Sequence, residues 1–159
     1  MKIQRARQWY SIALIVLFIT IAGCSDKESK EQTAHPYDDT ANAKQEISSA
    51  LAKLSGEKRV LLVFGANWCP DCRRLDASLK QPEITGYLNN TFSIVKVNLG
   101  NFDKNMDLSD HYGSPIKGGI PALVILGKDD SVERIIRGGE VAKEHKKGRE
   151  SFYRWLKTL

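Results

Sequence analysis

Two cysteines three positions apart, Cys69 and Cys72, are the residues of this sequence best suited to chemistry. They belong to the segment WCPDC, in which Pro70 and Asp71 favour the first turn of a helix. Unpaired backbone N–H groups at a helix start stabilise a thiolate, which is the nucleophile of thiol–disulfide exchange. A second thiol one turn later can attack the resulting mixed disulfide and release the partner. The spacing therefore predicts a redox pair with Cys69 as nucleophile and Cys72 as resolving thiol.

The alternatives for this pair are a zinc half-site and a structural disulfide. Zinc generally takes four ligands, but His35 lies in a polar stretch, and His111 and His145 are not at ligand spacing. A structural disulfide is seldom found in a Trp-Cys-Pro-x-Cys segment directly after a buried strand. Because thiol exchange needs only the two sulfur atoms, we predict no metal and no organic cofactor.

The third cysteine, Cys24, follows a segment with the features of an export signal. A basic start, MKIQRARQ, precedes an apolar run over residues 9–23, which is shorter than the roughly 20 residues that a membrane span needs. The tetrapeptide IAGC at its end resembles the lipobox of bacterial lipoproteins, in which the cysteine is diacylated and becomes the N-terminus. The resemblance implies a lipoprotein signal peptide over residues 1–23 and lipidation of Cys24. A membrane-spanning anchor or an ordinary signal peptide is the alternative.

The residues after Cys24 bear on location. In enterobacterial lipoproteins, an Asp directly after the lipidated cysteine retains the protein in the inner membrane. Ser25 holds that position here and Asp26 comes one residue later, which slightly favours the outer membrane. We therefore expect a lipid-anchored, periplasm-facing protein of the bacterial cell envelope.

The net charge of +5 does not indicate a nucleic-acid-binding protein. Lys2, Arg5 and Arg7 are the only charged residues before Cys24. Without these three, 21 of the 24 basic residues remain against 19 acidic residues, and the signs are well mixed along the chain. Such mixing is typical of a solvated surface rather than of a phosphate-binding face.

Composition divides the remainder into a tether and one folded domain. Residues 25–40 are polar, charged and nearly free of aliphatic residues, so residues 24–40 are predicted to form a flexible tether, with the domain over residues 41–159. The patterns within the domain predict a helix through 47–54, a buried strand at 59–64, a helix from the cysteine pair to about residue 80 that resumes after Pro82, a strand at 92–97, a short helix at 106–112, strands at 122–126 and 132–137, and a last helix with Phe152, Trp155, Leu156 and Leu159 on one face.

This order predicts an α/β fold with a mixed four-stranded sheet and helices on both faces. The first two strands are joined through a helix and should be parallel, whereas the last two are joined by a tight turn and should be antiparallel. The segments VLLVFGANWCPDC and GGIPALVIL resemble the active-site strand and the later proline segment of thioredoxins. The likeness covers roughly residues 45–158 and implies the thioredoxin-like fold.

The resemblance also implies roles for residues around the cysteines. In thioredoxins the proline of the second segment is cis and lies against the cysteine pair, and the backbone before it binds the substrate. This implies a cis Pro121 and a substrate-docking main chain at Ile120, although an ordinary loop proline is the alternative. Trp68 is expected to pack beside the cysteines and to limit solvent access, and Pro70 and Asp71 to support the site.

Three departures from thioredoxin stand out. Pro70-Asp71 replaces the usual Gly-Pro between the cysteines. Val63 holds the strand position of a buried Asp that assists proton transfer, so Lys96 should lack its usual carboxylate partner. An insertion over Asn98–Ser114 could border the site, with His111 and Tyr112 as candidate contacts, although a solvated loop is the simpler expectation.

These features predict a thiol–disulfide oxidoreductase that acts on protein disulfides of the envelope as a monomer. The direction of electron flow depends on the reduction potential and on the protein that resets the pair. We favour a reductase with a membrane-linked thiol partner, because an obvious dimerisation domain of the kind used by dimeric isomerases is missing. The alternative is a non-catalytic lipoprotein that uses the thioredoxin fold to hold a partner or a metal.

Overall fold

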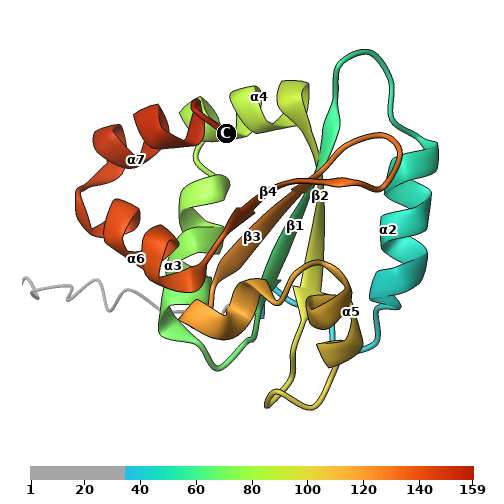
Figure 1. Cartoon of the computed structure of the whole chain (residues 1–159). Helices are drawn as coiled ribbons and strands as arrows, with labels where there is room; N and C mark the ends of the chain where they lie inside the picture. Colours follow the sequence, from blue (N-terminus) through green and yellow to red (C-terminus); the bar gives the residue numbers. More distant parts are fainter. Residues whose placement is uncertain (1–34) are drawn as a thin grey trace, which may run out of the picture. The chain divides into compact units, whose positions relative to one another are not determined.

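The computed structural model describes residues 35–159, which contain one mixed sheet with the strand order β2-β1-β3-β4 (Figure 1). Strand β1 (Arg59–Gly65) pairs in parallel with β2 (Phe92–Asn98) and antiparallel with β3 (Ala122–Leu126), and β3 pairs antiparallel with β4 (Val132–Ile136). The apolar run of β1 is buried on both faces, as expected for a central strand. The predicted fold class and strand directions are confirmed.

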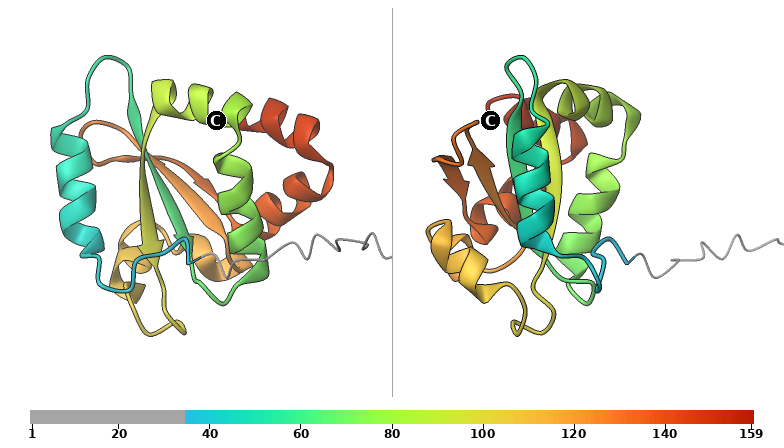
Figure 2. Two further views of the ribbon diagram at one scale, coloured as in Figure 1. Left: turned by 180° about the vertical axis from the view of Figure 1, so that it is seen from behind. Right: turned by 90° about the vertical axis from the view of Figure 1, so that its right-hand side faces the viewer.

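Helices cover both faces of this sheet (Figures 1 and 2). One face packs against α2 (Ala43–Ala52) and α5 (Met106–His111), and the other against α3 (Pro70–Leu79), α4 (Pro82–Thr91), α6 (Gly138–Lys146) and α7 (Arg149–Leu156). Alternate residues of β1 serve the two cores, since Leu62 faces α2 and Leu61 faces α3. No helix among residues 35–159 is long and apolar enough to cross a membrane.

The C-terminal part holds two helices where the sequence predicts one. Helix α6 begins with two glycines and buries only Gly138 and Val141, so it has no apolar stripe that the pattern could reveal. Gly148, with φ of 94°, then redirects the chain into α7, whose Phe152 and Leu156 are fully buried. The predicted apolar face of the last helix is correct, but the helix before it was missed.

The segment before α2 packs on the domain rather than forming part of a tether. Tyr37 is only 2% exposed and belongs to one buried cluster with Cys69 and Cys72. The prediction of a tether through residue 40 is therefore wrong from Tyr37 onward. The polar composition misled it, because a single aromatic side chain is enough to anchor this segment. Cys24 and the predicted signal peptide lie outside the described residues.

Candidate active site

The turn after β1 places both cysteines at the start of α3, as the sequence predicts. Cys69 is the N-cap residue, its Sγ accepts a hydrogen bond from the Cys72 backbone N–H at 3.2 Å, and Pro70 occupies the first turn. Both cysteines are free thiols, Cys69 4% exposed and Cys72 fully buried. The helix start thus presents backbone donors to the Cys69 sulfur, which suits it to carry negative charge.

The loop before β3 lies against Cys69. The Ile120–Pro121 peptide bond is cis, and the Cys69 thiol donates to the Ile120 carbonyl oxygen over 3.7 Å. Ile120 is partly buried against the cysteine cluster. The structure therefore brings together the two segments that the resemblance singled out, and the main chain of Ile120 borders the nucleophilic sulfur.

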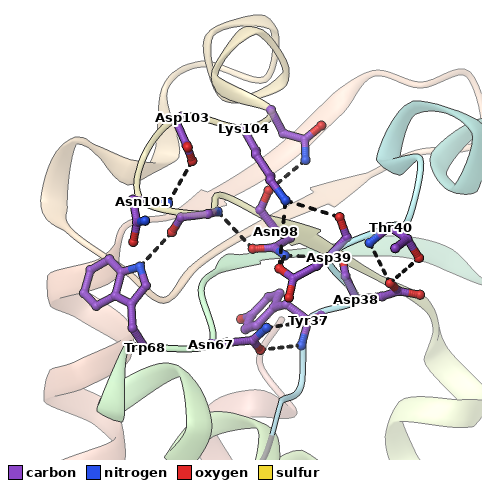
Figure 3. Close-up of polar contacts among 12 residues, drawn as sticks. Tyr37, Asp38, Asp39, Thr40, Asn67, Trp68, Asn98, Asn101, Asp103 and Lys104 are labelled. Atoms are coloured by element: carbon purple, nitrogen blue, oxygen red, sulfur yellow. Dashed lines mark hydrogen bonds and ion pairs between the residues drawn. The ribbon is translucent and has the colours of Figure 1, made fainter.

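The Trp68 side chain contacts the insertion. Its indole N–H donates to the Gly100 carbonyl at 2.7 Å (Figure 3). Its ring meets Phe102 edge-on with 5.7 Å between centroids. Trp68 is 49% exposed and Phe102 is 44% exposed. This hydrogen bond directs the indole toward the insertion, and the shielding of the cysteines by Trp68 stays a prediction. The two rings form an exposed aromatic surface beside Cys69.

The insertion borders the site through Gly100 and Phe102 rather than through the residues proposed from sequence. Tyr112 is buried in the core shared with α2, and its hydroxyl donates to Asp130 at 3.0 Å. Burial, followed by this hydrogen bond, raises the pKa of Tyr112. His111 stacks edge-on against Tyr112. Neither residue contacts the cysteine cluster.

Charges on the first turn of α3 are largely paired with one another. Asp71 forms an ion pair with Arg74, and both side chains are substantially exposed. Arg73 instead donates to the Asn67 carbonyl at 2.9 Å, which braces the turn in front of Cys69. The charge of Asp71 is thus partly neutralised by Arg74.

Cys72 faces a different environment, made by Tyr37 and Gly65. A Cβ built on Gly65 would lie 2.1 Å from the Tyr37 hydroxyl oxygen and 2.9 Å from Cys72 Sγ, so only glycine fits between them. Burial and the hydrogen bond and charge of Cys69 raise the pKa of Cys72, while the Ala66 backbone N–H and the Tyr37 hydroxyl lower it. The net effect is a raised pKa, so Cys72 stays a protonated thiol until the resolving step.

Tyr37 is held in place through its own backbone. Asn67 accepts a hydrogen bond from the Tyr37 N–H at 2.9 Å and donates to the Tyr37 carbonyl at 2.8 Å (Figure 3). The next residues are bound by the end of β2 and the insertion, where Asn98 donates to Asp39 at 2.8 Å and Lys104 donates to the Asp39 carbonyl at 3.2 Å. Sequence reasoning missed this segment; its one signal was a lone tyrosine in a polar stretch.

Lys96 has a carboxylate partner after all, on α3 rather than on β1. Asp76 is 6% exposed and forms ion pairs with Lys96 and, at 2.7 Å, with Lys80. Burial raises the pKa of Asp76, but the hydrogen bonds and charges of the two lysines outweigh burial and hold it below its usual range. Val63 stands opposite Lys96 in the sheet, so the usual carboxylate on this strand is missing, as expected, and Asp76 of α3 pairs with Lys96 instead.

A hollow of about 460 Å³ adjoins the aromatic surface. Its lining includes Trp68, Arg73, Asn67, Asp39 and Lys104, so it runs from the start of α3 to the insertion. Within residues 35–159, no three His, Cys, Asp or Glu side chains come close enough to hold a metal ion.

Comparisons with known proteins agree with this geometry. A family model described as thioredoxin-like matches residues 42–128. A solved structure of a disulphide isomerase from Xylella fastidiosa Temecula1 is 42% identical, covers 79% of this chain and 96% of that one, and superposes with a TM-score of 0.73. A thioredoxin from Thermus thermophilus is 18% identical over 72% of this chain and 81% of that one, with a TM-score of 0.50, and shares the fold. No protein with a curated description matches significantly.

Proposed function

Because the chain belongs to the thioredoxin-like family and is a thiol–disulfide oxidoreductase of the thioredoxin fold, we propose that it reduces or rearranges disulfides in proteins of the bacterial envelope. The observation that carries this proposal is the position of Cys69. Its sulfur lies between the N–H groups of a helix start and the Ile120 carbonyl, at the edge of the fold where an extended chain can pair with the Ile120 backbone.

The proposed cycle starts from the dithiol. The Cys69 thiolate attacks one sulfur of a substrate disulfide, the substrate S–S bond breaks, and its second sulfur leaves and takes up a proton. Cys72 then loses its proton and attacks the Cys69 sulfur of the mixed disulfide. The substrate leaves as a thiol, having gained two electrons, and Cys69 and Cys72 end as a disulfide.

We propose that the dithiol is the working form of the pair. Reduction and isomerisation both begin with attack by a reduced cysteine, whereas an oxidase works from the disulfide. The 42%-identical relative is described as a disulphide isomerase. The upward direction of the Cys72 pKa also supports a dithiol that is stable until a substrate arrives. A membrane-linked thiol partner would return the disulfide to this form after each reduction.

The substrate class that we propose is protein rather than small thiols. The exposed rings of Trp68 and Phe102 offer apolar contact beside the nucleophile, and the Ile120 main chain offers backbone pairing. We further propose that lipidation of Cys24 places a monomer at a membrane surface facing the periplasm, on the evidence of the lipobox-like IAGC.

Insulin reduction by the full chain, together with the reduction potential of the Cys69–Cys72 pair, tests this function. We expect turnover with a thiol donor and a potential nearer to that of thioredoxin than to that of a strong oxidant such as DsbA, which lies about 150 mV higher. A potential as high as that of DsbA would contradict the dithiol as the working form. Partner binding without any turnover would instead favour a non-catalytic binding protein.

A further inference from the structure

A buried tyrosine hydroxyl lies beside the resolving cysteine. The distances from the Gly65 position put the Tyr37 hydroxyl and Cys72 Sγ in the same small space, and the hydroxyl lowers the pKa of the Cys72 thiol. Tyr37 comes from the segment before α2, far from the cysteines in sequence, and is 2% exposed. Its backbone is fixed by two hydrogen bonds to Asn67, so the position of the hydroxyl is built into the fold.

The surroundings of Cys72 make a hydrogen-bond donor valuable there. Cys72 is fully buried, and burying a thiolate without donors is costly. The residue of β1 that faces this region from the α3 side, Val63, is apolar and cannot help. The groups that favour a thiolate there, by lowering the pKa of Cys72, are the Ala66 backbone N–H and the Tyr37 hydroxyl.

The tyrosine is suited to donate a proton in a hydrogen bond but not to act as a base. Burial, followed by the charges of Cys72, Cys69 and Asp76, raises the pKa of Tyr37, so the phenol keeps its proton throughout the physiological range. Lys80 and Lys96 keep Asp76 ionised, so its negative charge is present to act on Tyr37.

We propose that the Tyr37 hydroxyl donates a hydrogen bond to the Cys72 thiolate in the resolving step. Cys72 loses its proton and its Sγ attacks Cys69 Sγ while the bond from Cys69 to the substrate sulfur breaks. The electron pair leaves with the substrate sulfur, which takes up one proton, so protons and electrons balance. Tyr37 stabilises the negative charge on Cys72 before attack and keeps its own proton. This inference rests on the proposed redox function.

The test is a Tyr37→Phe variant of the full chain, which keeps the buried ring and removes only the hydroxyl. Hydrogen bonds to charged groups contribute about 1.5–3 kcal/mol, so release of substrate from a preformed mixed disulfide should slow about tenfold or more. The pH at which release is half-maximal should rise by about one unit. The rate at which Cys69 is first alkylated should stay within about twofold of wild type, because that sulfur is stabilised by the start of α3.

Tyr112→Phe is the matched control. Tyr112 is also a buried tyrosine whose hydroxyl donates a hydrogen bond, to Asp130, but it does not belong to the cysteine cluster. Tyr112→Phe should lose about as much thermal stability as Tyr37→Phe, but it should leave the pH profile of substrate release unchanged. A fluorotyrosine at position 37, whose more acidic phenol is a stronger donor, should shift the profile the opposite way from Tyr37→Phe.

A readout without turnover separates this inference from the proposed function. In a Cys24→Ser, Cys69→Ala background Cys72 is the single remaining cysteine, so thiolate absorbance reports its titration, and adding Tyr37→Phe should move that titration to higher pH. An unchanged Cys72 titration and an unchanged release profile would overturn the role of Tyr37, even in an active enzyme. If the wild-type chain reduced no disulfide but the titration still moved, the hydrogen bond would stand and the proposed function would fail.

Discussion

The site has two halves, the surroundings of Cys69 and the surroundings of Cys72, and these are built in different ways. Around Cys69 the contacts are made by backbone groups: the N–H groups at the start of α3 and the carbonyl before the cis proline. Beside Cys72 lies a side chain from a distant segment, Tyr37, which arrives from before α2, and the charge of Asp76, which pairs with Lys96 across α3 and β2, acts on Tyr37.

This difference shows which part of the chemistry is tied to the fold. A nucleophile at a helix start needs geometry that the β1–α3 turn supplies whatever the neighbouring side chains are. A buried resolving thiol needs a polar group within reach, and side chains from several elements can supply it. An apolar residue such as Val63 on β1 is therefore compatible with a buried resolving thiol, because other elements supply the polar groups.

Replacing each cysteine separately should give the largest effects and should distinguish the halves. Cys69→Ser should abolish turnover, by about a thousandfold or more, and should form no mixed disulfide. Cys72→Ser should also stop turnover but should accumulate a mixed disulfide with substrate. Mass spectrometry of the trapped adducts checks this. Adducts on Cys72 in the Cys69→Ser variant would reverse the assigned roles.

Gly65→Ala should disrupt the Cys72 half through packing. The new methyl group would overlap the Tyr37 hydroxyl and press on Cys72 Sγ, so we expect a loss of about 2–3 kcal/mol in the free energy of unfolding. Gly86→Ala is the control, because that glycine lies exposed in α4 with nothing within 4 Å of the added methyl group. It should instead stabilise by about 0.5–1 kcal/mol. Urea unfolding of both variants measures the contrast, and equal effects would contradict the close approach.

Asp76→Asn should change both stability and its pH dependence. The pKa of Asp76 is lowered in the folded state, so its ion pairs stabilise the fold above the unfolded carboxyl pKa of about 4. This contribution is lost as the pH falls through the lowered folded value. The variant should therefore lose about 2 kcal/mol at pH 7 and should lose less further stability than wild type on acidification.

The control for Asp76 is Asp107→Asn, which breaks the exposed Lys44–Asp107 pair. Exposed pairs contribute little, so its stability at pH 7 should be close to that of wild type. Thermal unfolding between pH 2 and pH 7 compares the three proteins. Parallel curves for wild type and Asp76→Asn would show that the buried pair is not the source of acid sensitivity.

The smallest expected effect belongs to the Cys69 half and concerns substrate contact. Phe102→Gly removes an exposed ring and suits the positive φ of 63° at this position, so stability should change little. We expect KM for a protein substrate to rise about threefold to fivefold with kcat unchanged, since about 1 kcal/mol of apolar contact is lost. Val132→Ala, an exposed apolar residue on β4, should leave KM unchanged. A change in kcat alone would contradict substrate contact at Phe102.

Local patterns in the sequence were enough to predict the Cys69 half and the sheet. The apolar run from Val60 to Phe64 indicated the central strand, and the Cys69–Cys72 spacing at a helix start indicated the redox pair. The cis form of Pro121 followed from the family resemblance. Each of these depends on a short segment or on a motif that is visible in one stretch of chain.

The Cys72 half could not be predicted in this way, because its contacts join residues far apart in sequence. Tyr37 and Asn67 are 30 positions apart, and Asp76 and Lys96 are 20 apart. Polar composition around Tyr37 predicted a tether, and no periodicity marks a single buried aromatic residue. The charge of Asp76 hid its burial, since an isolated carboxylate is expected on the surface.

With the lipid that we propose on Cys24, the packing of Tyr37 would also limit how far the enzyme can work from a membrane. Tyr37 comes thirteen residues after Cys24, so with the lipid that we propose on Cys24, the connecting chain can reach at most about 45 Å, however it is arranged. Substrates and the reducing partner would then have to come within this short radius, which raises their effective concentration when they share the same membrane. Any pull on that connection would be transmitted first to the residue that contacts Cys72.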